Sequence, residues 1–149
     1  MNYFRLVALS IALLTTATGA AQAVEFKSVG AAPAVLYDAP SEKGRKVFVA
    51  PRGMPVEVVL GYGEWVKVRD AAGDLFWIEA KALTTKRTLV VKVGGARVRA
   101  TADDSGNVVM TADKNVLLEL AEPVSSGWVK VRHRDGQAGF IKATDVWGD

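Results

Sequence analysis

The chain has 149 residues, a formal net charge of +3 and 50% hydrophobic residues, which is enough for one ordinary domain or two small ones. It contains no cysteine, which excludes disulfides, a thiol nucleophile and a lipid anchor on cysteine. The nearly balanced charge and the short, local runs of lysine and arginine exclude a nucleic-acid-binding stripe.

The first predicted element is a signal peptide over residues 1–23. Arg5 precedes an apolar run from Leu6 to Leu14, and Ala21-Gln22-Ala23 has the small-x-small pattern that signal peptidase accepts. A membrane span needs about 20 apolar residues, whereas this run is interrupted by threonine and glycine after about ten. We therefore predict cleavage after Ala23, a periplasmic location and no membrane anchor in the mature chain.

From residue 24 onward the sequence predicts β-strands. Apolar residues alternate with polar ones, which is the period of half-buried strands and not of helices. Val56, Val58 and Leu60 are expected on one face of a strand, and Val66 and Val68 on the buried face of the next. Turn sequences rich in glycine, asparagine and serine separate these segments. The fold class is therefore predicted to be all-β.

The sequence Trp-Val-Lys-Val-Arg occurs twice, at residues 65–69 and 63 positions later (128 − 65) at residues 128–132. A glycine and then an aromatic-isoleucine pair follow each copy at the same spacing. A period near 60 indicates one small domain present twice. Between the halves we align Leu36 with Val98 and Val58 with Leu118, and we assign the differences in spacing to loops.

The repeat predicts one domain over residues 24–85 and a second over residues 86–149. A unit of about 60 residues buries too little surface to be very stable alone. We therefore expect the two domains to pack together through residues 84–93, a stretch too short and too β-branched for a flexible linker.

Two motifs of the second half have diverged equivalents in the first: Gly127-Trp128-Val129-Lys130-Val131-Arg132 corresponds to Glu64-Trp65 and the residues after it, and Gly139-Phe140-Ile141 corresponds to Phe76-Trp77-Ile78. Through these motifs each half resembles the bacterial SH3-like domain. The resemblance implies two tandem SH3-like β-barrels. More narrowly, the chain is similar to exported tandem SH3-like proteins of proteobacteria, through Gly53-Met54-Pro55-Val56-Glu57-Val58, Lys86-Arg87-Thr88 and Val146-Trp147-Gly148.

Strand alternation places Trp65, Lys67 and Arg69 together on the face opposite the buried valines, and the second copy repeats this arrangement. An aromatic ring can stack on a sugar or peptide plane while cations meet carboxylates. The alternative is structural: each tryptophan covers the end of a barrel, and the cations keep its surface wet. The full set of candidate ligand-binding residues is Tyr62, Trp65, Lys67, Arg69, Trp77, Trp128, Lys130, Arg132, Phe140 and Trp147.

The residues that carry catalysis in other proteins are scarce here. The single histidine, His133, is expected in a hairpin turn, and nothing around it indicates a catalytic triad. The turn at Asp103 and Asp104 lacks the spaced carboxylates of a calcium loop. We predict no enzymatic activity and no catalytic, cofactor-binding or metal-binding residues.

The sequence thus favours a non-enzymatic binding protein of the cell envelope. The family resemblance implies peptidoglycan or its peptides as the ligand, and two weak sites would gain avidity on a repeating polymer. The alternative is an adaptor that docks an exported partner protein through an exposed barrel face or an unpaired strand edge.

Overall fold

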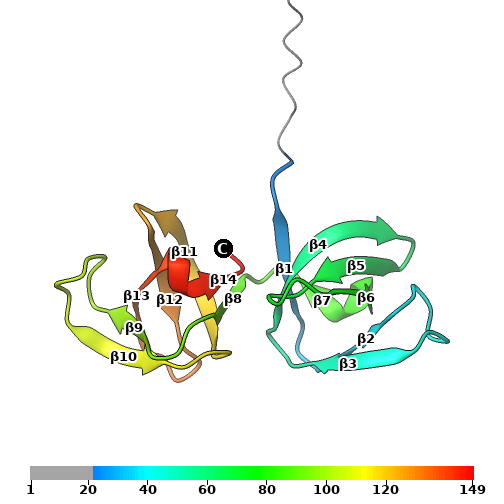
Figure 1. Cartoon of the computed structure of the whole chain (residues 1–149), viewed down its shortest axis with the longest axis horizontal. Coiled ribbons are helices and arrows are strands. Elements are labelled where there is room, and N and C mark those ends of the chain that lie inside the picture. The colour runs from blue at the N-terminus through cyan, green and yellow to red at the C-terminus, as the bar shows by residue number, and fades with distance from the viewer. Residues whose placement is uncertain (1–21) are drawn as a thin grey trace, which may run out of the picture.

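The computed structural model describes residues 22–149, so the predicted signal peptide, residues 1–23, lies almost entirely outside the described residues. Within that range the secondary structure consists of β-strands and two short 3-10 helices, which confirms the predicted all-β class. Figure 1 shows two separate lobes side by side, one for each half of the chain. No helix of the described residues is long and apolar enough to cross a membrane.

The two halves contain the same elements in the same order. The first half contains β1 (Glu25–Val29), β2 (Ala34–Tyr37), β3 (Lys46–Ala50), β4 (Pro55–Tyr62), β5 (Trp65–Arg69), β6 (Leu75–Glu79), η1 (Ala80–Ala82) and β7 (Leu83–Thr84). The second half contains β8 (Thr88–Val91), β9 (Ala96–Arg99), β10 (Val108–Ala112), β11 (Leu117–Ser125), β12 (Trp128–Arg132), β13 (Ala138–Lys142), η2 (Ala143–Asp145) and β14 (Val146–Trp147).

Each half forms one seven-stranded antiparallel sheet. The strand order is β3-β2-β6-β5-β4-β1-β7 in the first and β10-β9-β13-β12-β11-β8-β14 in the second. Every strand therefore has a counterpart at the same place in the other sheet. This identity of topology confirms that the halves are two copies of one unit.

Each sheet encloses its own hydrophobic core. In β5 the side chains of Val66 and Val68 are buried, and in β12 those of Val129 and Val131 are, as the alternation predicted. The first core is formed by Val29, Ala34, Leu36, Ala50, Val56, Val66, Val68 and Ile78. The second is formed by Leu89, Val91, Ala96, Val98, Ala112, Leu118, Val129, Val131, Ile141 and Val146.

The expectation that Leu60 shares the apolar face of Val56 and Val58 is wrong. The pairing of β4 with β5 shifts by one residue between Val58 and Leu60, and Leu60 is 46% exposed. A β-bulge inserts one unpaired residue and turns the following side chains to the other face. The alternation therefore holds only up to the bulge.

The alignment of Val58 with Leu118 is also wrong, by two residues. Glu57 pairs with Arg69 in the first sheet and Glu119 with Arg132 in the second, so Val56 is the counterpart of Leu118. Both of these side chains are buried. A shift of two residues keeps every side chain on the same face, so alternation alone does not detect it.

The stretch between the halves is more than a connection. Thr88–Val91 forms β8, which pairs with β11, and Leu89 and Val91 are fully buried in the second core. Its counterpart β1 holds the same place in the first sheet. Packing of this stretch between the domains was expected, whereas neither strand was predicted from the sequence.

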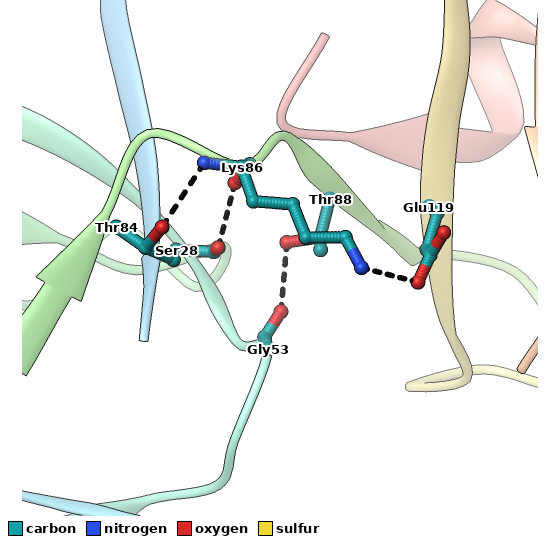
Figure 2. A network of polar contacts seen from close by, with 6 residues as sticks. All are labelled: Ser28, Gly53, Thr84, Lys86, Thr88 and Glu119. Carbon is teal, nitrogen blue, oxygen red and sulfur yellow. Dashed lines mark hydrogen bonds and ion pairs between the residues drawn. The ribbon is translucent and has the colours of Figure 1, made fainter. Parts of the chain in front are cut away.

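Polar contacts fix the junction between the two halves (Figure 2). The buried Ser28 hydroxyl donates to the Lys86 backbone oxygen at 2.7 Å, and the buried Thr88 hydroxyl donates to the Gly53 backbone oxygen at 2.7 Å. The Lys86 ammonium lies 2.5 Å from the Glu119 carboxylate. Both hydroxyls join the first half to the chain that leads into the second.

Aromatic contacts close the same junction. The ring of Phe26 in β1 meets the ring of Trp147 in β14 edge to face, with centroids 5.1 Å apart. The Arg87 guanidinium lies 5.3 Å from the Phe26 centroid and donates to the Gly148 backbone oxygen at 2.7 Å. A Cβ at Gly148 would lie 2.8 Å from the Thr88 backbone oxygen, so only glycine fits there without displacement. The halves therefore pack directly on each other, as expected.

Candidate functional site

The outward face of β5 and β12 carries the predicted tryptophans and cations. Trp65, Lys67 and Arg69 alternate with the two buried valines and are partly exposed. The cations already have partners within the chain: Arg69 Nη1 lies 2.8 Å from Glu57 Oε1, and Lys67 Nζ lies 5.8 Å from the centroid of Trp77. The face is as predicted, but its two cations are engaged locally.

Four aromatic residues of the first half form a continuous group on this face. Trp65 meets Tyr37 edge to face at 5.3 Å between centroids, and Tyr62 meets Trp77 at 6.4 Å. The strand register places Tyr37 opposite Trp77 and Tyr62 opposite Trp65. Tyr37 is only 7% exposed, so its ring packs against Trp65 and offers little surface to a ligand.

The second half keeps only part of this group. Arg99 occupies the place of Tyr37, opposite Phe140, and Ser125 occupies the place of Tyr62, opposite Trp128. Lys130 lies 5.9 Å from the centroid of Phe140 and 2.8 Å from the Glu122 carboxylate. Aromatic groups were predicted in both halves, and the group in the first half is the larger.

Two candidates remain, Trp147 and Arg132. The structure places Trp147 at the junction between the halves, against Phe26, and does not bring it together with the other candidates. Arg132 is exposed at the end of β12.

A polar cleft lies beside the repeated tryptophan in each half. The first has a volume of about 340 Å³ and is lined by Pro40, Ser41, Glu42, Lys43, Glu64, Trp65 and Glu79. The second has a volume of about 350 Å³ and is lined by Val93, Gly94, Gly95, Ala96, Arg97, Arg99, Asp104, Trp128, Lys142 and Asp145. Of the ten predicted residues, Trp65 and Trp128 line these clefts and the other eight do not.

Tight turns hold one wall of each cleft. In the first half, Asp38 Oδ1 accepts the backbone N–H of Arg45 at 2.8 Å, and Gly44 N–H donates to the Ser41 backbone oxygen at 2.9 Å. A Cβ at Gly44 would lie 2.9 Å from that same oxygen, so the turn requires glycine. The loop is thereby held across from the tryptophan that begins β5.

The corresponding loop of the second half contains Asp103. Asp103 Oδ1 accepts the Ser105 backbone N–H at 2.8 Å, and it also accepts the Ser105 hydroxyl. These hydrogen bonds, that of the Ser105 side chain foremost, hold the pKa of the Asp103 carboxyl below its usual range. The Asp103 carboxylate thus stabilises its own turn, as predicted for this loop.

His133 lies in the hairpin turn between β12 and β13, as predicted. Its backbone N–H donates to Gln137 and its backbone oxygen accepts from Gly136. Its Nδ1 is 3.0 Å from Asp135 Oδ1. Among residues 22–149, no group of three or more histidine, aspartate or glutamate side chains is placed to hold a metal ion.

Sequence reasoning missed the charged residues that line the two clefts beside the tryptophans. Glu79 is the cross-strand partner of Trp65, and Lys142 is the cross-strand partner of Trp128. Glu42 and Asp104 belong to loops far from the tryptophans in sequence. One signal was present: Glu79 and Lys142 both follow their tryptophan by the same number of residues, and their charges are opposite.

The known proteins that are similar to this chain share little of its sequence. No curated protein matches the chain. Among solved structures, it is similar to NlpC2 and NlpC1 from Trichomonas vaginalis, at 13% and 14% identity and TM-scores of 0.39 and 0.40, covering 86% and 94% of this chain. It is also similar to an NlpC/P60 family protein from Bacillus cereus, at 17% identity and a TM-score of 0.38, covering 83% of this chain.

The chain spans about half the length of these three proteins, at 49%, 51% and 56%. The family model described as the bacterial SH3 domain matches residues 30–84 and again residues 92–148. Each match lies within one of the two sheets and the turns around it. The chain therefore belongs to the bacterial SH3 domain family, in two tandem copies.

Proposed function

We propose that this protein is a non-enzymatic binding protein of the cell envelope, and that its two tryptophan clefts recognise peptidoglycan or its peptides. The observation that carries the proposal is the recurrence of an open polar cleft of about 340 to 350 Å³ beside the same tryptophan in both halves. Bacterial SH3 domains are typically cell-wall binding modules, which supports this choice of polymer.

The chemistry of the clefts suits such a ligand. Each is lined by the repeated tryptophan together with charged side chains, and a tryptophan ring can stack on a sugar or on a peptide plane. The charged groups can then bind the ammonium and carboxylate groups of a peptide. The predicted signal peptide, Met1–Ala23, would carry the chain to the compartment that holds this polymer.

Two clefts on one chain would raise the apparent affinity for a polymer. When one cleft is occupied, the second meets a high local concentration of ligand, so two weak sites together bind far more tightly than either alone. The direct packing of the halves, through Ser28, Thr88 and Phe26, would hold the clefts in a fixed relation.

Co-sedimentation with purified peptidoglycan sacculi at moderate salt tests the proposal. The protein is expected to sediment with sacculi, Trp65→Ala and Trp128→Ala each to weaken binding, and the double variant to lose it while staying folded. Phe48→Ala is the matched control, because Phe48 is an aromatic residue 48% exposed on β3, outside both clefts. Protein that stays in the supernatant, or double-variant protein that binds normally, would refute the proposal.

One observation favours an adaptor as the second candidate function. β3 is an edge strand of the first sheet, and Val47, Phe48 and Val49 on it are 45%, 48% and 61% exposed. An exposed edge strand can pair with a strand of another protein. Crosslinking in the periplasm would then trap one specific protein, and Phe48→Ala would reduce that product. Intact sacculus binding without any crosslinked protein would exclude the adaptor.

A further inference from the structure

The two clefts overlap at the tryptophan and at two further equivalent positions, and beyond these their linings come from different segments. Trp65 pairs across the strands with Glu79, and Trp128 pairs with Lys142. The residue directly opposite the tryptophan is thus an anion in the first half and a cation in the second. The two halves therefore carry opposite charges beside their equivalent tryptophans.

A second pair of equivalent positions differs in the same direction. The residue before each tryptophan accepts a backbone hydrogen bond, from Ala80 to Glu64 at 2.8 Å and from Ala143 to Gly127 at 2.9 Å. Glu64 and Gly127 therefore correspond. Glu64 lines the first cleft, whereas Gly127 has no side chain and does not line the second.

A loop carboxylate is present in both clefts, but its surroundings differ. In the second half, Lys142 Nζ lies 2.8 Å from Asp104 Oδ1, which neutralises that carboxylate. Asp104 corresponds to Glu42, because both lie two residues before the glycine of matching turns. Glu42 shares its cleft with Glu79, which replaces the lysine. The first cleft thus keeps the loop carboxylate and loses the cation that neutralises it.

The first cleft is lined by three carboxylates and one ammonium, Lys43. Lys81 Nζ lies 2.6 Å from Glu79 Oε2 and pairs with it, as Lys142 pairs with Asp104 in the second half, which leaves three carboxylates against two ammonium groups. Glu79, and more weakly Glu42 and Glu64, raise the pKa of Lys81 above its usual range. A cation near this cleft is therefore stabilised by all three carboxylates.

The second cleft is lined by three cations and two carboxylates. Arg99, in the place of Tyr37, donates from Nη1 to the Gly106 backbone oxygen at 2.8 Å, so it lies along the loop that bounds the cleft. Arg97 is exposed and forms no ion pair within residues 22–149. With Asp104 already paired to Lys142, the cleft retains an excess of positive charge.

We propose that the two clefts bind different chemical groups: the first an aliphatic ammonium group with its carbon chain against Trp65, the second a carboxylate beside Trp128. This inference rests on the proposed function and specifies it. A peptide that carries both a free ammonium and a terminal carboxylate would engage both clefts, whereas a ligand with only one of these groups would engage only one. The duplication would then have produced two complementary sites and not two copies of one site.

NMR titration with two small probes tests this assignment on the intact protein. Nα-acetyl-lysine amide carries one ammonium and no carboxylate, and Nα-acetyl-alanyl-alanine carries one carboxylate and no ammonium. We expect the first probe to shift the indole N–H signal of Trp65 and not that of Trp128, and the second probe to do the reverse. Because exposed charge pairs are individually weak, we expect a several-fold difference in affinity between the two clefts for each probe.

Charge reversal at the cross-strand positions sharpens the test. Glu79→Lys is expected to weaken binding of the ammonium probe at least about three-fold while leaving the carboxylate probe unchanged, and Lys142→Glu to do the converse. Lys114→Glu is the matched control, an equal reversal at an exposed turn outside both clefts. The probe selectivity of the unmodified protein stands as a test even where a variant fails to fold.

The outcomes separate this inference from the proposed function. Equal response of both tryptophans to both probes, or no response of either, would overturn the assignment of the clefts. Sacculus binding that persists in that case would leave the proposed function standing. Failure of the unmodified protein to bind sacculi would overturn the proposed function itself.

Discussion

The junction between the halves predicts that they unfold as one unit, and Thr88→Val tests this directly. Thr88 is 7% exposed, and its hydroxyl donates to the backbone oxygen of Gly53 at 2.7 Å. Valine has nearly the same shape but cannot donate. The variant therefore loses a hydrogen bond and leaves a carbonyl of the other half without its partner, which costs about 1 to 3 kcal/mol.

Differential scanning calorimetry measures this effect. We expect one transition for the unmodified protein, because a unit of about 60 residues is marginal alone, and a midpoint lowered by about 4 to 10 °C in Thr88→Val. Thr111→Val is the matched control, since Thr111 is exposed on β10 and should change stability by no more than about 0.5 kcal/mol. Two well-separated transitions in the unmodified protein, or equal effects of both substitutions, would refute the coupling of the halves.

Three further predictions concern single positions. Gly139→Ala should lower the free energy of unfolding in urea by about 1 to 3 kcal/mol, because the added Cβ would lie 2.5 Å from a backbone oxygen of β9. Gly61→Ala is the control and should be almost neutral, because a Cβ there would meet nothing within 4 Å. Similar losses for both variants would contradict the close packing at Gly139. The hydrogen bond from Lys86 holds the pKa of Glu119 below its usual range, so this pair stabilises the fold at neutral pH and loses that effect as the pH falls through the lowered pKa. Lys86→Met should raise the pKa of Glu119, as measured by NMR titration. An unchanged pKa of Glu119 would argue against the pair. Arg69→Gln should leave sacculus binding intact, because Arg69 pairs with Glu57 and lies outside both clefts. Loss of binding in this variant would show that the binding site includes the outward face of β5.

The fold was largely predictable because two features of the sequence indicate it, the alternation of apolar residues within strands and the repeat of one strand. Alternation around Val66 and Val68 depends only on neighbouring residues, and the repeat of that strand 63 positions later (128 − 65) reveals the duplication. The bulge that exposes Leu60 was not predictable, since no side chain in β4 marks the unpaired residue. The strand at Thr88–Val91 was missed because it is short and follows directly on the connection.

The clefts were harder to predict because each is assembled from distant segments. Trp65 was identified from the repeat, but Glu42 reaches the cleft through a loop whose path depends on the turn at Gly44. Trp147 was placed with the other aromatic residues by type alone, and its contact with Phe26 depends on how the halves pack. Composition identifies candidates, whereas the strand register decides which of them meet.

In the proposed function, the two clefts beside the repeated tryptophans bind peptidoglycan fragments. The most direct measurement follows the indole N–H signals of the 4 tryptophans while soluble peptidoglycan fragments are added. We expect saturable shifts at Trp65 and Trp128, and none at Trp147, which is packed at the junction. Unchanged signals at both cleft tryptophans, or shifts confined to Trp77 and Trp147, would argue against binding in the clefts.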